Sequence, residues 1–580
     1  MKVIDSLKQT TSLYDFSKFL GYKESSLAYI LYSKQYKNKY TSFTIPKKNG
    51  GTRSINTPDC KLKKVQKILS EKLQKCYEEI QQEDQRYLTA NYVRKKIVHS
   101  YRPNTSIETN AFCHRNKRFV LNLDLNNFFP CINFGRIYGY FIKDKNFCLN
   151  PKVSTIIAQL SCYNNELPQG APTSPVIANF IAKILDIKLL KLAKEYNLTY
   201  TRYADDITFS CNSRSFPENI AFVKNGKWIL GNRLVETIKQ SGFSINNLKT
   251  RMHYNNSRQD VTGLVVNRKV NVKREYYKKI RAQCYSLFNK GYFYDEKDKS
   301  DINALKKLEG RLNFVFYAKN FENKLHRTDT QKQEESRKNF IKITGKDKFF
   351  DNKRNDNYAH ISLIKSLPSV HKLYFMFLFY KYFVYEKQCL ILCEGKTDNI
   401  YIKCAIDKLR DKLDFNHSIK FIPHSKILNL LTEFLGGTSK LKKFCNNYQI
   451  ILEGFKAAKD YPPLIIVVDN DNDGRDVAAN KNFINIDEDI KFMKPNLYVL
   501  TLPCLSKSSN TIIEDYFDDK IKIFEGKTFN AKNQQCTETE FGKNVFATQV
   551  VLKHKNDIDF SKFVPLLQKI DIIINSHYPK

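Results

Sequence analysis

Two adjacent aspartates interrupt a run of residues that otherwise favours a β-strand, in the segment TRYADDITFS at residues 201–210. Thr, Tyr, Ile and Phe fit a pleated sheet, whereas Asp is depleted from strands and common in turns. The segment therefore predicts a strand, a tight turn and a second strand, with the carboxylates of Asp205 and Asp206 at the tip. Adjacency alone proves little, because the chain has a second such pair, Asp518–Asp519, which we interpret as a solvated patch.

Like charges at a strand tip need a compensating interaction. Two carboxylates about 4 Å apart repel by roughly 4 kcal/mol at an effective dielectric constant of about 20. Mg²⁺ prefers carboxylate and phosphate oxygens, so an ion between the two groups turns repulsion into binding. We expect a third acid, Asp124, from the β-type run RFVLNLDLNNFFP (118–130). Three such acids can hold two metal ions, one that activates a hydroxyl group and one that steadies a leaving pyrophosphate.

The net charge of +37 over 580 residues points to a polyanionic partner, of which nucleic acid is the usual one. A lysine-rich compositional bias is the alternative. The fourteen cysteines include no C-x-x-C pair, which argues against a zinc site or a disulfide framework and favours a reducing, cytoplasmic location. No signal peptide is expected at the N-terminus. The apolar stretch 373–385 is too short to span a bilayer and contains Lys381, so we expect no membrane contact.

The stretches around these acids resemble the polymerase motifs of reverse transcriptases, in which YADD is the characteristic turn of the palm. The resemblance covers about residues 40–320. It implies that Asp124, Asp205 and Asp206 are metal-binding catalytic acids that use Mg²⁺ at a two-metal site. It also implies deoxynucleoside triphosphates as substrates, and a primer grip in VTGLVVN (261–267). The substrate-binding residues that it implies are Lys47, Lys48 and Arg53 of a fingers hairpin (44–55), Phe129 as a gate against the 2′-hydroxyl, Gln169 and Gly170 of a positioning loop, and Lys249 near the leaving phosphate.

The segments NAFCH (110–114) and VTG (261–263) resemble marks of bacterial retron reverse transcriptases. That family implies a cognate structured noncoding RNA (msr–msd) as partner, self-priming at a guanosine 2′-hydroxyl, and a branched, RNA-linked single-stranded DNA product (msDNA). Asn110 and His114 are candidate RNA contacts, with a structural histidine as the alternative. Asn127 stands where many relatives carry another acid, which removes one nearby charge.

The basic helical region after the primer grip is, by the same resemblance, a thumb that recognises RNA. Phosphate contacts suit its cations and base stacking suits Tyr276 and Tyr277. A solvated basic helix face is the alternative. The candidate cations are Lys273, Arg274, Lys278, Lys279 and Arg281.

A second set of acids follows two apolar runs, LILCEG from residue 390 and LIIVVDND from residue 464. Such runs are typical of parallel strands, which present ligands at their carboxyl ends. Glu394 ends the first run, and Asp469 and Asp471 end the second. A solvated loop after a buried strand is the alternative.

This second pattern resembles the TOPRIM fold. The resemblance implies acid/base work for Glu394 and one or two Mg²⁺ ions on Asp469 and Asp471. Three further acids, Asp473, Glu514 and Asp515, are candidate accessory residues, two of them resembling acids of the OLD-family nucleases. Since neither a topoisomerase domain nor a primase zinc module is recognisable, phosphodiester cleavage is preferred.

The expected fold class is an α+β right-hand polymerase with fingers, palm and thumb, followed by an α/β TOPRIM domain with a parallel sheet. The expected function is a retron reverse transcriptase with a fused TOPRIM nuclease effector that acts in antiphage defence. Another bacterial reverse transcriptase, either group II intron-like or an unclassified defence polymerase, and a noncatalytic RNA-binding scaffold are the alternatives. The nuclease substrate, the trigger and any homo-oligomer stay open. The expected segments are a helical cap (1–40), fingers and palm (41–267), thumb (268–320), connector (321–385), TOPRIM domain (386–520) and its C-terminal extension (521–580).

Overall fold

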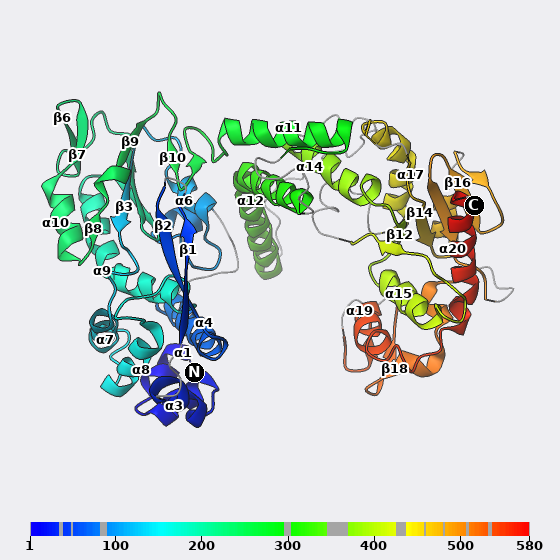
Figure 1. Cartoon of the computed structure of the whole chain (residues 1–580), viewed down its shortest axis with the longest axis horizontal. Helices are drawn as coiled ribbons and strands as arrows, with labels where there is room; N and C mark the ends of the chain where they lie inside the picture. The colour runs from blue at the N-terminus through cyan, green and yellow to red at the C-terminus, as the bar shows by residue number, and fades with distance from the viewer. Residues whose placement is uncertain are drawn as a thin grey trace. The chain divides into compact units, whose positions relative to one another are not determined.

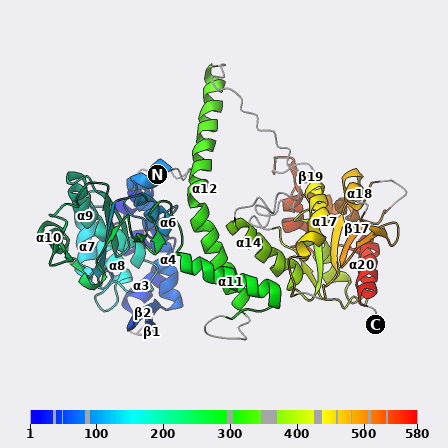
Figure 2. The same cartoon turned by 90° about the horizontal axis from the view of Figure 1, so that it is seen from above.

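A computed structural model describes residues 2–33, 39–47, 50–81, 90–294, 303–344, 369–424, 437–457, 460–479, 482–505, 510–531 and 536–578. The chain divides into two compact units (Figures 1 and 2). The first contains Met1–Arg274 and Tyr317–Asp351, and the second contains Glu275–Phe316 and Asn352–Lys580. Helix α12 (Ala304–Thr344) contributes residues to both units. The six segments expected from the sequence are finer than this division, and their boundaries stay predictions.

Unit 1 is built around an antiparallel sheet with strand order β4-β5-β3-β8, in which β9 also pairs with β3. Strands β4 and β5 lie on either side of Ala204 and Asp205, so the predicted strand, turn and strand are confirmed. The strands of this sheet are β3 (Phe119–Asn126), β4 (Thr199–Tyr203), β5 (Asp206–Cys211), β8 (Ser244–Ile245) and β9 (Arg251–Tyr254).

Helices and three hairpins complete the described part of unit 1. Apolar residues of the N-terminal helices, such as Leu7, Phe16 and Leu27, belong to the same hydrophobic core as the central sheet. The helices are α1 (Val3–Lys8), α2 (Leu13–Leu20), α3 (Glu24–Tyr32), α4 (Cys60–Gln81), α5 (Ala90–Lys95), α6 (Ile107–Cys113), α7 (Phe134–Lys143), α8 (Pro151–Ser161), α9 (Ser174–Glu195) and α10 (Asn232–Gln240). The hairpins are β1 (Tyr40–Pro46) with β2 (Thr52–Pro58), β6 (Ala221–Lys224) with β7 (Lys227–Leu230), and β10 (Asp260–Val261) with β11 (Leu264–Val265).

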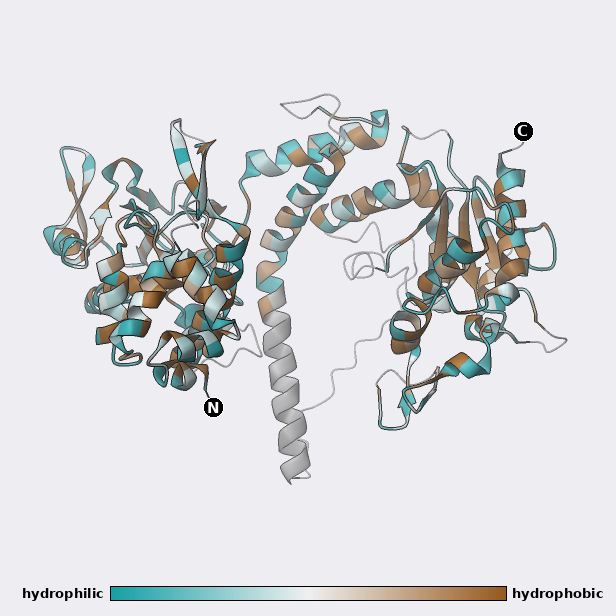
Figure 3. Cartoon of the chain, turned by 60° about the horizontal axis from the view of Figure 1, so that its bottom comes forward, coloured by the Kyte–Doolittle hydropathy of each residue, from teal (hydrophilic) through white to brown (hydrophobic). Residues whose placement is uncertain are grey.

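The sheet of unit 2 has the order β13-β12-β14-β17-β16-β15. Its first four strands are parallel, and the last two pair antiparallel. Strands β12 and β14 are buried along their whole length, which explains their unbroken apolar sequences. Figure 3 shows these apolar strands lying among helices. The strands are β12 (Cys389–Cys393), β13 (Ile419–Phe421), β14 (Leu464–Val468), β15 (Ile484–Asn485), β16 (Ile490–Met493) and β17 (Leu497–Thr501).

The helices of unit 2 come from both sides of this sheet in the sequence. Phe288 of α11 packs against Tyr380 and Phe455, with ring centroids 5.8 and 5.3 Å away. Phe563 and Ile570, near the C-terminus, share one core with the sheet residues Ile391 and Ile465. The helices are α11 (Arg274–Lys290), α14 (Ser369–Phe379), α15 (Asp398–Leu409), α17 (Thr438–Leu452), α18 (Asn472–Ala478), α19 (Lys543–Val545) and α20 (Val564–His577). None of the helices in the described part of the chain has the length and apolar character needed to cross a bilayer.

Candidate functional sites

The three palm acids lie at one end of the sheet of unit 1. Asp124, near the end of β3, stands directly opposite Asp206, the first residue of β5. Asp205 lies in the turn before it, and its carbonyl accepts a hydrogen bond of 2.9 Å from the Leu125 N–H. The sheet register therefore brings together the three carboxylates that the sequence places far apart.

Repulsion between these carboxylates contributes to raised pKa values. Burial and the charge of Asp124 raise the pKa of Asp205. Partial burial and the charges of Asp205 and Asp124 raise the pKa of Asp206 to about 7. An excess of negative charge of this kind fits a divalent cation.

Lys249 partly compensates this charge. Its ammonium donates a hydrogen bond of 2.8 Å to Asp124 Oδ2, and this bond raises the pKa of Lys249. In the residues that the structure covers, no three His, Cys, Asp or Glu side chains are arranged to enclose a metal ion as they stand.

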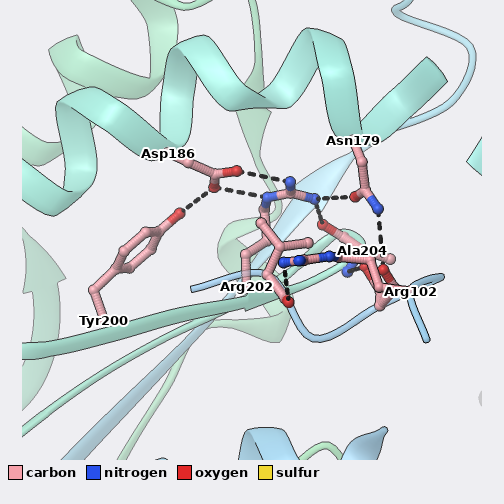
Figure 4. A network of polar contacts seen from close by, with 8 residues as sticks. Arg102, Asn179, Asp186, Tyr200, Arg202 and Ala204 are labelled. Carbon is pink, nitrogen blue, oxygen red and sulfur yellow. Dashed lines mark hydrogen bonds and ion pairs between the residues drawn. The ribbon is translucent and has the colours of Figure 1, made fainter. Parts of the chain in front are cut away.

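A buried guanidinium fixes the YADD turn (Tyr203–Asp206), as Figure 4 shows. Arg202 is fully buried and donates two hydrogen bonds of 2.8 Å to the Asp186 carboxylate. It also donates to the Ala204 carbonyl at 3.1 Å. The Ala204 N–H donates to Ser100 Oγ at 2.8 Å. Both backbone groups of Ala204 are therefore held, although its φ of +57° is unusual for a residue with a side chain.

Three of the residues expected to bind the nucleotide have contacts that the structure defines. Phe129 is half-buried against Phe128, with ring centroids 5.3 Å apart. Gln169 accepts a hydrogen bond of 2.8 Å from the Asn56 N–H, which ties the positioning loop to the β1–β2 hairpin. Gly170 has a φ of +122°, and a Cβ there would meet the Asn56 carbonyl at 2.8 Å, so only glycine fits.

The structure describes two basic side chains of the β1–β2 hairpin, Lys47 and Arg53, and both are exposed. Only Arg53 interacts electrostatically with the palm acids. The charge of Arg53 acts on Asp205, whereas no contact links Lys47 of the hairpin turn to the acids. Lys48 lies outside the described residues.

The second set of acids lies at the carboxyl edge of the parallel strands. Glu394 follows β12 and Asp469 follows β14, and these two strands are neighbours in register from Leu390↔Leu464 to Cys393↔Val467. The segment at Thr511 pairs with Asn470, which brings the buried Glu514 close to Asp469.

These carboxylates also resist ionisation. Burial, Asp398 and Asp471 raise the pKa of Glu394 to about 7. Burial, Asp398 and Glu394 raise the pKa of Asp469 to about 8. One carboxylate oxygen of Glu394 and one of Glu514 are buried without a hydrogen-bond partner. Buried acceptors with no donor fit a cation that the carboxylates would hold.

The other acids of this region differ in their hydrogen-bond partners and exposure. Asp471 caps helix α18 by accepting a hydrogen bond of 2.8 Å from the Gly474 N–H. Gly474 itself must be glycine, because a Cβ would lie 1.9 Å from the Asp469 carbonyl. Asp473 is exposed beside the site, and Asp515 is exposed and accepts a hydrogen bond from the Ile512 N–H, which is a capping role.

The polymerase region has recognisable relatives. A family model described as reverse transcriptase (RNA-dependent DNA polymerase) matches residues 45–276. The retron Ec86 reverse transcriptase of Escherichia coli is 31% identical over 280 residues, which cover 48% of this chain and 78% of that protein. The retron Ec73 reverse transcriptase of the same species is 32% identical over 300 residues, which cover 48% and 82%. The chain belongs to the retron reverse transcriptases.

The match to another relative covers less than two thirds of that protein's length. The retron Mx162 reverse transcriptase of Myxococcus xanthus is 30% identical over 341 residues, which cover 54% of this chain and only 64% of that protein. Among solved structures, a telomerase from Candida albicans in complex with a fragment of telomeric RNA has a TM-score of 0.30 at 12% identity, covering 63% of each chain.

Asn110 and His114, the expected RNA contacts, both have fully buried side chains, which favours the alternative of a structural histidine. The His114 ring nitrogens lie 2.7 Å from Ser210 Oγ and 2.7 Å from Thr201 Oγ1. Thr201 Oγ1 donates to Asn110 Oδ1 at 2.6 Å. Burial lowers the pKa of His114 well below its ordinary value, so the ring is neutral. This polar chain fastens α6 to the palm sheet of the retron enzyme.

The candidate RNA-binding residues on helix α11 and just before it differ in exposure and in their contacts. Arg274, Lys278, Lys279 and Arg281 are exposed. Lys273 precedes the helix and forms an ion pair of 3.2 Å with Asp260. Tyr276 packs edge-to-face against Phe314 with centroids 6.1 Å apart, so its ring is partly used within the unit. Tyr285, on the same helix, is 71% exposed and is the better stacking face.

Several residues of these sites escape sequence reasoning. Arg202 stands inside the segment TRYADDITFS and Asp186 within the apolar sequence of α9, and a charge in such a run was the available signal. Asp398 accepts a hydrogen bond of 2.7 Å from the Gly395 N–H and faces the second site. Lys543 donates to Glu514 at 3.1 Å. No local pattern marks Lys543, because only the tertiary fold brings it to the acids.

We predict that Arg202→Met lowers the free energy of unfolding by about 3–5 kcal/mol, because Asp186 is left as an unpaired buried charge. Urea unfolding measures the loss. The double variant Arg202→Met/Asp186→Leu should recover part of it, because neither charge is then buried. Arg233→Met is the control, since Arg233 pairs with Glu195 at the surface and should cause little change. Equal stability of wild type and Arg202→Met would contradict the assigned role.

Proposed function

We propose that this chain is an RNA-directed DNA polymerase of the retron type. The observation that carries the proposal is the register of the palm sheet, which sets Asp124 opposite Asp206 with Asp205 beside them. Asp124, Asp205 and Asp206 would hold Mg²⁺, which when bound neutralises their charge and activates the primer hydroxyl. The raised pKa values of Asp205 and Asp206 support this assignment, because buried carboxylates that repel one another favour a bound cation.

The neighbouring residues would position the nucleotide. Arg53 supplies positive charge for the triphosphate on the side of Asp205, and Lys249 supplies it for the departing phosphate. Phe129 stands where a 2′-hydroxyl would be excluded. Gly170 allows the positioning loop to approach the β1–β2 hairpin closely, which keeps Gln169 next to the nucleotide.

The proposal that the reaction is of the retron type rests on the similar proteins described above. Their names describe retron reverse transcriptases. We infer a cognate structured RNA as partner and template, self-priming at a guanosine 2′-hydroxyl, and a branched RNA-linked DNA product. The exposed cations of α11, with Tyr285, are suited to phosphate contacts and stacking on that RNA.

We propose that the second acidic site is a TOPRIM-type nuclease. Glu394 would move a proton during phosphodiester cleavage, since a pKa of about 7 allows it to serve as acid or base near neutral pH. Asp469, Asp398 and Asp471 would hold Mg²⁺, which when bound steadies the charge of the cleaved phosphate. Lys543 donates a hydrogen bond to Glu514 and opposes the rise that burial causes in the pKa of Glu514.

The biological role that we propose is antiphage defence, in which the bound RNA–DNA product restrains the nuclease until infection disturbs it. The support is that one chain carries both acidic sites. Cells expressing Glu394→Ala should lose protection against phage relative to cells expressing wild type. Equal protection would remove the nuclease from the mechanism.

Asp205→Asn/Asp206→Asn should abolish primer extension on an RNA template with Mg²⁺, because the variant loses two of the three metal-binding charges. We expect at least about a thousand-fold loss of rate, measured by incorporation of labelled nucleotide. Asp518→Asn/Asp519→Asn is the matched control, since it alters the other adjacent aspartate pair. Equal signals from wild type and the palm variant would favour a noncatalytic RNA-binding scaffold.

DNA that copurifies with the active protein should be short, single-stranded and attached to RNA through a 2′,5′ branch. Sequencing before and after treatment with a debranching enzyme measures this linkage. Linear DNA alone would instead favour another kind of bacterial reverse transcriptase. The palm variant supplies the background, because it should carry no such DNA.

Mg²⁺ should raise the unfolding temperature of unit 2 at about pH 8.5 and much less at about pH 5.5, where protons occupy the raised carboxyls. The sign follows from the raised folded-state pKa values of about 8 for Asp469 and about 7 for Glu394. Without metal, their contribution to stability is present below about pH 4 and is lost as the pH rises through 7 to 8. Asp469→Asn should remove most of the Mg²⁺ effect in this unit, and an unchanged effect would argue against the site.

A further inference from the structure

Tyr101 holds a backbone conformation that its own side chain disfavours. Its φ is +57°, in the left-handed region that bulky residues rarely enter. Its ring is 45% exposed, so burial offers little compensation for the strain. Strained residues of this kind persist where a side chain is needed in a particular place, and they gather at functional sites.

The segment before Tyr101 is fixed to the palm sheet. The Arg202 N–H donates to the Ile97 carbonyl at 2.8 Å, and the His99 N–H donates to the Arg202 carbonyl at 3.0 Å. Ser100 accepts from the Ala204 N–H through Oγ, and its carbonyl accepts from Asn179 at 3.0 Å. The same contacts that hold the YADD turn therefore hold Tyr101, and the two cannot move independently.

The ring of Tyr101 faces the groups expected around a nucleotide. Its centroid lies 6.3 Å from that of Phe129, with the ring planes inclined by 58°. The charges of Asp205 and Arg53 both act on its phenol group. Tyr101 thus lies near Asp205, Phe129 and Arg53, three residues of the proposed nucleotide site, and none of the sequence motifs assigns it a role.

We propose that Tyr101 contacts the incoming nucleotide and forms, together with Phe129, an aromatic wall against its sugar and base. An aromatic face suits this task, because every base presents a π-face on which a ring can stack without reading the sequence. The half-exposed ring is free to accept such a ligand, and the fixed backbone keeps it in place. The inference rests on the proposed polymerase activity and adds a substrate-contacting residue to it.

Single-nucleotide incorporation by the full chain, with its RNA template and primer, tests the proposal. Tyr101→Ala should raise the KM for the deoxynucleotide about 10-fold, as expected for loss of a stacking face, with a much smaller change in kcat. The Kd for primer–template, measured separately by fluorescence anisotropy, should not change. Tyr101→Phe keeps the ring and should restore a KM within about twofold of wild type.

Two further variants separate the ring from the strain. Tyr101→Gly removes the ring and also relieves the left-handed φ, so it should be more stable to heat than Tyr101→Ala. Both should nevertheless share the same raised KM. Tyr14→Ala is the matched control, because Tyr14 is 57% exposed on α2 and should leave the KM unchanged.

The proposal is overturned if Tyr101→Ala leaves the KM unchanged, or if only kcat or primer–template affinity falls. It is also overturned if the KM follows thermal stability across the Ala and Gly variants, because that pattern marks a purely structural residue. A wild-type protein that extends no primer defeats the polymerase proposal itself, and this inference falls with it.

Discussion

The ion pair between Arg202 and Asp186 allows two repelling carboxylates to stand at the tip of one hairpin. A buried charge is costly unless its partners are complete, so the guanidinium has a single arrangement with the Asp186 carboxylate and the Ala204 carbonyl. The turn cannot shift without breaking that arrangement. Ser100 holds the other side of Ala204. The geometry of the palm acids thus depends on groups that never need to touch a substrate.

The two acidic sites lie in different folds but have similar electrostatics. Each gathers carboxylates at strand ends, where burial and mutual repulsion raise their pKa values. In each, one lysine from a later element pairs with one of the acids, Lys249 with Asp124 and Lys543 with Glu514. A single ammonium cannot neutralise three or four carboxylates. The remaining negative charge is what a divalent cation would bind, and it explains why both sites hold carboxylates that are hard to ionise.

Local patterns predict local structure well here, and they fail where burial decides the outcome. The alternation around YADD and the unbroken apolar run of β14 follow from residue preferences over a few positions, so the turn and the parallel strands were predictable. The burial of His114 depends on Ser210 and Thr201 reaching it from two other strands. Lys543 likewise reaches Glu514 only through the packing of the C-terminal helices. Pairings of this kind are tertiary, and no spacing along the chain encodes them.

The positive net charge of the chain favours binding of phosphate groups, whereas the negative charge of the palm site opposes it unless a cation is bound. With 96 basic and 59 acidic residues, the chain attracts nucleic acid over long distances. The palm acids repel the phosphates that arrive, because Lys249 neutralises only one of them. Mg²⁺ bound to these acids would therefore strengthen phosphate binding, and by linkage a bound phosphate would strengthen Mg²⁺ binding by the same factor. Neither ligand would then need to bind tightly alone, so the proposed polymerase site would be complete only when nucleotide and metal are present together.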